Sequence, residues 1–124
     1  SLARGEHHRV VELLETWLTQ FSDHYVTQRA YFLSHMELGE VERARKGFIT
    51  LSRRFPEQNE LFYLVARTYA RVDDHSKAIG WLRTCEEKTV KTPEVFKQYL
   101  ADPEFDRMRG TDLFRRYYGD MSSK

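Results

Sequence analysis

The stretch that decides the fold runs from Asn59 to Lys91 and reads NELFYLVARTYARVDDHSKAIGWLRTCEEKTVK. On each side of Asp73-Asp74, apolar residues recur at three- and four-residue steps, the pattern of two amphipathic helices joined by a short turn. The same arrangement occurs 34 residues earlier, where Gly39-Glu40 stands in place of Asp73-Asp74. A period of this size is typical of a helix-turn-helix repeat, in which each unit needs neighbours to bury its apolar face.

Three pairs of residues in the second helices share this offset of 34: Ala44 and Ala78, Phe48 and Leu82, and Leu51 and Cys85. A small residue at a helix crossing allows two helices to approach to about 8–9 Å. The pairs therefore predict the buried face of each hairpin. The many cations of the first of these helices are expected to remain in water: Arg43, Arg45, Lys46, Arg53 and Arg54.

Read along the whole chain, the periodicity predicts helices over about Glu6–Phe21, Tyr25–Leu38, Val41–Phe55, Glu60–Val72 and His75–Lys88. Asp23 and Asn59 are expected to cap two of them. Thr92-Pro93-Glu94 and Asp102-Pro103-Glu104 each combine a capping side chain, a proline and an acid, which is helix-start chemistry. These two signals predict a helix to about Ala101 and one or two short capping helices up to Tyr118.

Composition excludes several classes of protein. With 40% hydrophobic and 31% charged residues in 124, the chain fits one globular domain, and its net charge of +1 gives no global attraction to nucleic acid or acidic membranes. A single cysteine, Cys85, excludes an intramolecular disulfide and a cysteine-based zinc site. No apolar run has the length of a transmembrane helix, so no membrane insertion and a cytoplasmic location are expected.

The residues that bear chemistry form no catalytic or metal-binding motif. We interpret His7-His8 as surface residues, His35 as a hydrogen-bonded interior histidine, and Cys85 as a packing residue in a small position of the repeat. The expectation is a protein that is not an enzyme and has no cofactor and no metal. The basic clusters are interspersed with acids, which favours solvated helix faces over a nucleic-acid site.

Taken together, these residues resemble the tetratricopeptide repeat (TPR) family. The clearest unit is 59–91, where Phe62, Val65, Ala66, Tyr69, Ala78, Leu82 and Cys85 match the pattern of the family. The resemblance implies an all-α fold, a right-handed α-α superhelix of TPR-like repeats with short C-terminal capping helices. It divides the chain into the second half of a truncated repeat (5–22), two repeats (25–58 and 59–91) and capping helices (92–118).

The resemblance has departures. Phe32 and His35 stand where a small residue and an aromatic are expected, which weakens the prediction of tight packing in the first hairpin. Val10 replaces the small residue of the truncated repeat. The segment from Asp102 to Phe114 is similar to one that closes bacterial TPR arrays, although Thr111-Asp112 replaces its second Asp-Pro. Because the chain opens in mid-pattern, it is expected to be a fragment of a longer one.

By the resemblance, the first helix of each unit lines a concave groove that binds proteins or peptides. Transferred by register, the groove residues are Val26, Arg29, Leu33 and Met36 in one unit, Tyr63, Arg67 and Arg71 in the next, and Lys97 in the capping helix. Cations beside apolar and aromatic groups predict an acidic or extended peptide as the partner. The asparagines of the family's carboxylate clamp are absent, which disfavours chaperone-tail binding.

Two other functions remain open at this point. The apolar first helix, with Trp17 and Phe21, could pair with a second copy to form a homo-oligomer. Alternatively, the chain could regulate an enzyme fused upstream or recruit its substrate.

Overall fold

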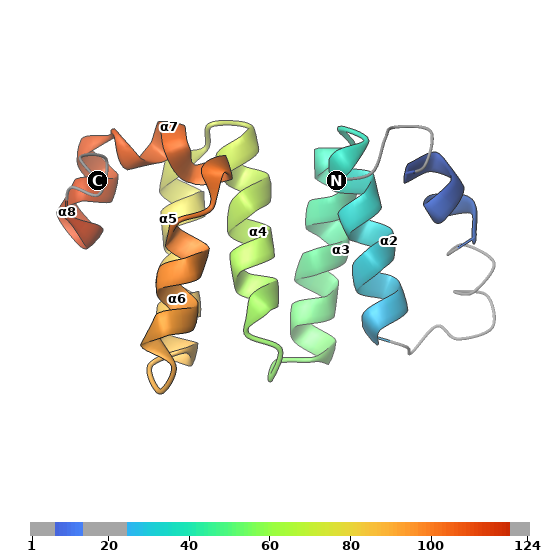
Figure 1. The fold of residues 1–124 in the computed structure, drawn as a ribbon, viewed down its shortest axis with the longest axis horizontal. Coiled ribbons are helices and arrows are strands. Elements are labelled where there is room, and N and C mark those ends of the chain that lie inside the picture. The colour runs from blue at the N-terminus through green and yellow to red at the C-terminus, as the bar shows by residue number, and fades with distance from the viewer. Residues whose placement is uncertain (1–6, 14–24, 120–124) are drawn as a thin grey trace. The chain divides into compact units, whose positions relative to one another are not determined.

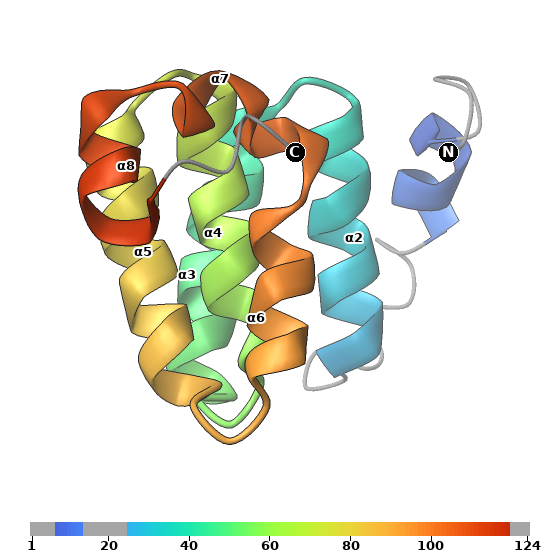
Figure 2. The same cartoon turned by 60° about the vertical axis from the view of Figure 1, so that its left-hand side comes forward.

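The computed structural model describes residues 7–13 and 25–119, and the secondary structure within these residues is helical without strands (Figures 1 and 2). The predicted all-α class is therefore confirmed. The chain divides into two compact units, Ser1–Glu57 and Gln58–Lys124. Trp17 and Phe21, which were predicted to lie on a self-association helix, fall outside the described residues.

The first unit contains a helical hairpin of α2 (Tyr25–Glu37) and α3 (Val41–Arg54), preceded by helical residues 7–13. The predicted core positions of α3 are confirmed, because Ala44, Phe48 and Leu51 are each at most 1% exposed. One predicted surface cation is not at the surface. Arg45 is 8% exposed and pairs with Glu42 one turn earlier, so its charge is compensated within α3.

The second unit begins with a hairpin of α4 (Glu60–Arg71) and α5 (His75–Lys88), followed by α6 (Pro93–Leu100), the 3₁₀ turn η1 (Pro103–Phe105), α7 (Asp106–Arg109) and α8 (Asp112–Tyr118). The capping segment packs against the hairpin (Figure 2): η1 contacts α4, and α6 and α8 contact α5. One hydrophobic cluster of its core contains Phe62, Ala66, Ala70, Ala78, Ile79, Leu82, Cys85, Phe96, Leu100, Phe105, Met108 and Phe114.

The turns of the two hairpins repeat each other bond for bond. The backbone N–H of Glu40 donates to His35 O and that of Gly39 to Met36 O; 34 residues later, Asp74 donates to Tyr69 O and Asp73 to Ala70 O. This pair of bonds defines a Schellman motif, which satisfies the last carbonyls of a helix. The residue at its centre has a positive φ in both units, +86° at Gly39 and +59° at Asp73. The sequence period is therefore a structural period.

We expect both central positions of these turns to prefer glycine over alanine by about 1 kcal/mol, because a Cβ is disfavoured in the left-handed region. Chemical denaturation should show that Gly39→Ala is less stable than the wild type, and that Asp73→Ala is less stable than Asp73→Gly. The comparison at position 73 removes the same carboxylate in both variants. Equal stabilities of the alanine and glycine variants would contradict the shared turn.

The helix starts agree only in part with their predicted caps. Asp102 Oδ1 accepts from Glu104 N at 2.8 Å, as predicted. Asn59 was wrong as a side-chain cap, because its Nδ2 donates across the unit to Lys88 O at 3.2 Å. Thr92 was also wrong, since its hydroxyl donates back to Thr89 O at 3.4 Å. Both side chains thus bond the end of α5, and the backbone turn alone begins the next helix.

Phe32, which replaces the small residue of the pattern, packs against a glycine of the other helix. Its ring lies directly against Gly47 of α3, and a Cβ built on Gly47 would lie 2.3 Å from two ring carbons. In the second unit, the corresponding residues are Ala66 and Trp81. The large and small residues have therefore exchanged helices, so that each hairpin has one aromatic residue and one small residue at these two positions.

Candidate functional site

The second unit holds an acidic segment of the chain itself against α4. Arg71 donates from Nη2 to Glu104 Oε1 at 2.5 Å, and its Nε lies 3.2 Å from both carboxylate oxygens. Arg67, one turn earlier, lies between the two acids, with Nε 3.3 Å from Asp102 Oδ2 and Nη2 3.6 Å from Glu104 Oε1. We call the segment Asp102-Pro103-Glu104 the acidic strap.

Aromatic contacts extend this arrangement along the same face of α4. The Tyr63 hydroxyl donates to Asp102 Oδ2, and its ring stacks on Tyr99 of α6 with centroids 4.2 Å apart and planes 10° apart. The Arg67 guanidinium lies 5.9 Å from the centre of the Tyr63 ring. Burial, and then the hydrogen bond and negative charge of Asp102, raise the pKa of Tyr63 above its ordinary value. The phenol therefore remains a donor to Asp102 at neutral pH.

Three of the predicted groove residues, Tyr63, Arg67 and Arg71, are thus brought together, and the strap is their common partner. Periodicity along α4 was sufficient to place them on one face, since they are four residues apart. The acidic partners, Asp102 and Glu104, were interpreted only as residues that begin a helix. The sequence does contain a charge pattern for this pairing, since two arginines four residues apart are followed by two acids two residues apart. The arginines and the acids are separated by more than 30 residues, so the pattern alone did not pair them.

The other predicted groove residues are placed differently. In the first unit, Arg29 and Leu33 are partly exposed and Val26 is 62% exposed, whereas Met36 is 1% exposed and belongs to the buried interior. Lys97 in the second unit lies on α6, away from the strap contacts, with its amine 3.9 Å from Glu94 and its side chain 73% exposed.

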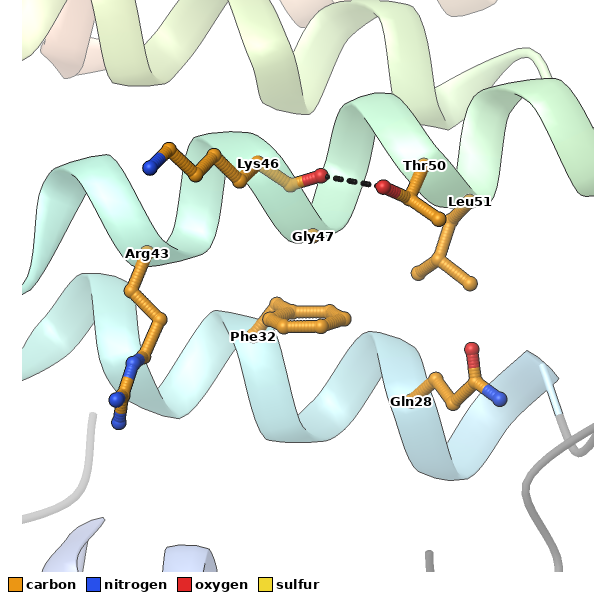
Figure 3. Close-up of a pocket in the computed structure, with 7 residues that line it drawn as sticks. All are labelled: Gln28, Phe32, Arg43, Lys46, Gly47, Thr50 and Leu51. Carbon is orange, nitrogen blue, oxygen red and sulfur yellow. Dashed lines mark hydrogen bonds between the residues drawn. The ribbon is translucent and has the colours of Figure 1, made fainter.

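The first unit has a pocket between α2 and α3 that the sequence analysis missed (Figure 3). Its volume is about 460 Å³, and the lining residues are Gln28, Phe32, Arg43, Lys46, Gly47, Thr50 and Leu51. The Phe32 ring lies between the two helices beside Gly47, while Arg43 and Lys46 extend from α3 (Figure 3). The only hydrogen bond among the side chains drawn runs from Thr50 Oγ1 to Lys46 O, at 2.9 Å.

The second unit has a pocket whose lining residues follow those of the first-unit pocket by 34 residues. It has a volume of about 450 Å³ and is lined by Phe62, Lys77, Gly80, Trp81 and Thr84, which correspond in register to Gln28, Arg43, Lys46, Gly47 and Thr50. The second-unit pocket is aromatic, with Phe62 and Trp81 stacked at 6.0 Å. The first-unit pocket has an amide and two cations instead. The period therefore extends from the turns to a recurring surface feature, whose chemistry differs between the units.

The histidines and the cysteine are partly as predicted. His35 is buried and its Nδ1 lies 3.2 Å from Glu40 Oε1, which confirms a hydrogen-bonded interior residue. His7 was wrong as a surface residue, since it is only 7% exposed. Cys85 is fully buried, its thiol lies 3.7 Å from Asn59 O, and burial raises its pKa to about 12. A thiol with so high a pKa is a poor nucleophile at neutral pH, which agrees with the packing role.

These pKa shifts predict that the second unit loses stability in alkali. The pKa values of Cys85, Tyr63 and Tyr118 are all raised, in each case mainly by burial. Above about pH 9 the unfolded chain therefore releases protons that the folded chain retains, so the contribution to stability is intact below that pH and falls as the pH rises further. Urea unfolding at pH 8, 10 and 11 should show this decline.

Tyr118→Phe is the matched variant for the alkaline experiment. The Tyr118 hydroxyl is buried and has no hydrogen-bond partner in the described part of the chain, so its removal should be tolerated at pH 8. The decline with pH should be shallower in this variant, because one group with a raised pKa is gone. A free energy of unfolding that stays level between pH 9 and 11 would contradict the expectation.

Among residues 7–13 and 25–119, no three histidine, cysteine or acidic side chains are grouped as metal ligands would be. Within the same ranges, no helix combines the length and the apolar character needed to cross a bilayer. Comparison of the chain with models of known protein families, with curated proteins and with solved structures finds no match. The geometry of the two units therefore carries the functional argument.

Proposed function

We propose that this chain is a non-enzymatic protein-interaction module of the TPR type, a right-handed superhelix of helical hairpins that binds an acidic segment of a partner protein. The observation that carries the proposal is the acidic strap, which is a short acidic segment already seated on a helix of one hairpin. The repeated turns and the repeated pockets support the assignment to a hairpin-repeat class.

The strap illustrates what such a helix face recognises. Two guanidinium groups one helical turn apart meet two carboxylates two residues apart, and the ring of Tyr63, stacked on Tyr99, lies beside Arg67. Charge-assisted hydrogen bonds of this kind are stronger than neutral ones and give directional specificity. The same combination of cation and aromatic ring can therefore bind an acidic segment from another protein.

The strap also limits where a partner can bind. Arg67 and Arg71 are engaged with the chain's own acids, so a partner would have to displace Asp102 and Glu104 to reach them. In the first unit, α3 exposes Arg43, Lys46, Arg53 and Arg54. Arg43 of this helix pairs with Glu40, and Arg45 pairs with Glu42. A partner can therefore reach Arg43 and Lys46 without displacing the strap.

A peptide array tests the proposed function. Acidic nonapeptides with one or two apolar residues should retain the labelled chain, whereas the same peptides with lysine in place of each acid should not. Binding of the best peptides should weaken between 50 and 500 mM NaCl, because salt screens exposed charges. An array on which acidic and basic peptides bind equally, or on which no peptide binds, would overturn the proposal.

A further inference from the structure

Gln28 places a side-chain amide in the lining of the first-unit pocket. This residue is only 9% exposed. Figure 3 shows the amide extending from α2 toward α3 beside Leu51. A side-chain amide has both donors and an acceptor, so it can satisfy the N–H and C=O of a peptide backbone.

The rim of the pocket carries positive charge. Arg43 and Lys46 are exposed and three residues apart on α3, so they lie on one side of the helix. Glu40 lies 3.8 Å from Arg43, so the two cations and this one acid leave the rim with a net positive charge. Arg53 and Arg54 continue the exposed positive charge toward the end of the helix. Carboxylates are therefore the side chains that this rim complements.

The floor of the pocket is apolar. The partly exposed ring of Phe32 rests on Gly47, and Leu51 closes one end. Because Gly47 has no side chain, the ring lies flat between the helices and leaves space above it. A volume of about 460 Å³ accommodates one aliphatic or aromatic side chain together with the backbone on each side of it.

We infer that this pocket between α2 and α3 binds an acidic peptide segment of a partner protein through a central apolar residue. In this arrangement, the Gln28 amide bonds the peptide backbone and Phe32 contacts the apolar side chain. Arg43 and Lys46 pair with the flanking carboxylates. The inference rests on the proposed function and assigns it a site and a class of partner. This site lies on the side of the second helix and includes none of the groove residues predicted from the resemblance to TPR proteins.

An RNA strand would also be attracted to the cations, but the described pocket favours a peptide. Recognition of single-stranded RNA relies on aromatic rings exposed for base stacking. Phe32 is the only aromatic residue among the lining residues, and its ring is held flat against Gly47. The Gln28 amide in the lining suits a peptide backbone, whose donor and acceptor alternate.

Fluorescence anisotropy with a defined probe tests the site. The probe is a fluorescein-labelled peptide with leucine at its centre and two glutamates on each side. We expect Arg43→Gln/Lys46→Gln and, separately, Gln28→Met each to weaken its Kd at least tenfold. Arg115→Gln/Arg116→Gln on α8 removes the same amount of exposed charge elsewhere and should change the Kd less than twofold. A peptide with glycine in place of leucine should bind at least fivefold more weakly.

The outcomes separate the site from the function. If the wild type and the pocket variants bind the probe equally well, the pocket assignment is overturned and the proposed function stands. If the wild type binds neither the probe nor any acidic peptide of the array, both are overturned. Tighter binding of labelled oligouridylate that displaces the probe would replace the peptide with RNA. Because Arg43 and Lys46 are exposed, their double variant remains folded and decides the question even if Gln28→Met does not.

Discussion

Replacing Gly47 by alanine should lower the free energy of unfolding by about 1–3 kcal/mol, although alanine is the better helix former. The reason is the Phe32 ring, which lies where the new Cβ would be. The ring would have to leave its position between α2 and α3, and the packing of the first hairpin would be lost with it. Urea denaturation followed by circular dichroism measures the change.

Gly80 provides the matched control for this substitution. It is also a helical glycine, but a Cβ built on it meets no atom within 4 Å. Gly80→Ala should therefore stabilise the protein by about 0.5–1 kcal/mol through helix propensity alone. In a Phe32→Ala background, the cost of Gly47→Ala should largely disappear. If Gly47→Ala were stabilising, or cost the same in both backgrounds, the packing of Phe32 on Gly47 would be refuted.

Neutralising Glu104 should cost about 1–3 kcal/mol, less than the 3–5 typical of a fully buried pair, because Glu104 is 15% and Arg71 30% exposed. Glu104→Gln keeps the shape of the side chain but leaves Arg67 and Arg71 with one carboxylate instead of two. The strap would then hold the capping helices less firmly against α4. Thermal and urea unfolding should both show the loss.

Asp112→Asn is the control for the strap, since the Asp112 carboxylate is 97% exposed in its pair with Arg115. Such surface pairs contribute little, so this variant should lie within about 0.5 kcal/mol of the wild type. A double-mutant cycle of Glu104→Gln with Arg71→Met should show that the two changes are not additive. If Glu104→Gln were as mild as Asp112→Asn, the strap would not be a stabilising contact.

Much of the fold was predictable because it depends on local patterns. Apolar periodicity placed the helices from Tyr25 to Lys88 within one or two residues of their observed bounds. The correspondence of Gly39 and Asp73 was also visible in the sequence, and the structure gives it a physical basis in the shared Schellman bonds. Helix period and turn chemistry involve residues close in sequence, so one sequence is sufficient to read them.

What the sequence did not reveal depends on contacts between distant residues. The contact of Phe32 with Gly47 was not predicted, because the two residues lie on different helices. The arginines of α4 were correctly placed on one face, but their acids lie beyond α6, and helix-start chemistry gave those acids another explanation. The pocket of the first unit escaped notice because its residues come from two helices and share no motif.

NMR titration of the ¹⁵N-labelled chain with the unlabelled glutamate-leucine peptide tests the central claim most directly, because it reports both binding and position. We predict saturable shifts of the Gln28 side-chain amide and of the Gly47 backbone amide, with little change at Gly80, the register equivalent of Lys46. Shifts confined to α4 and the strap, or no shifts at millimolar peptide, would contradict an interaction module whose first hairpin binds acidic segments.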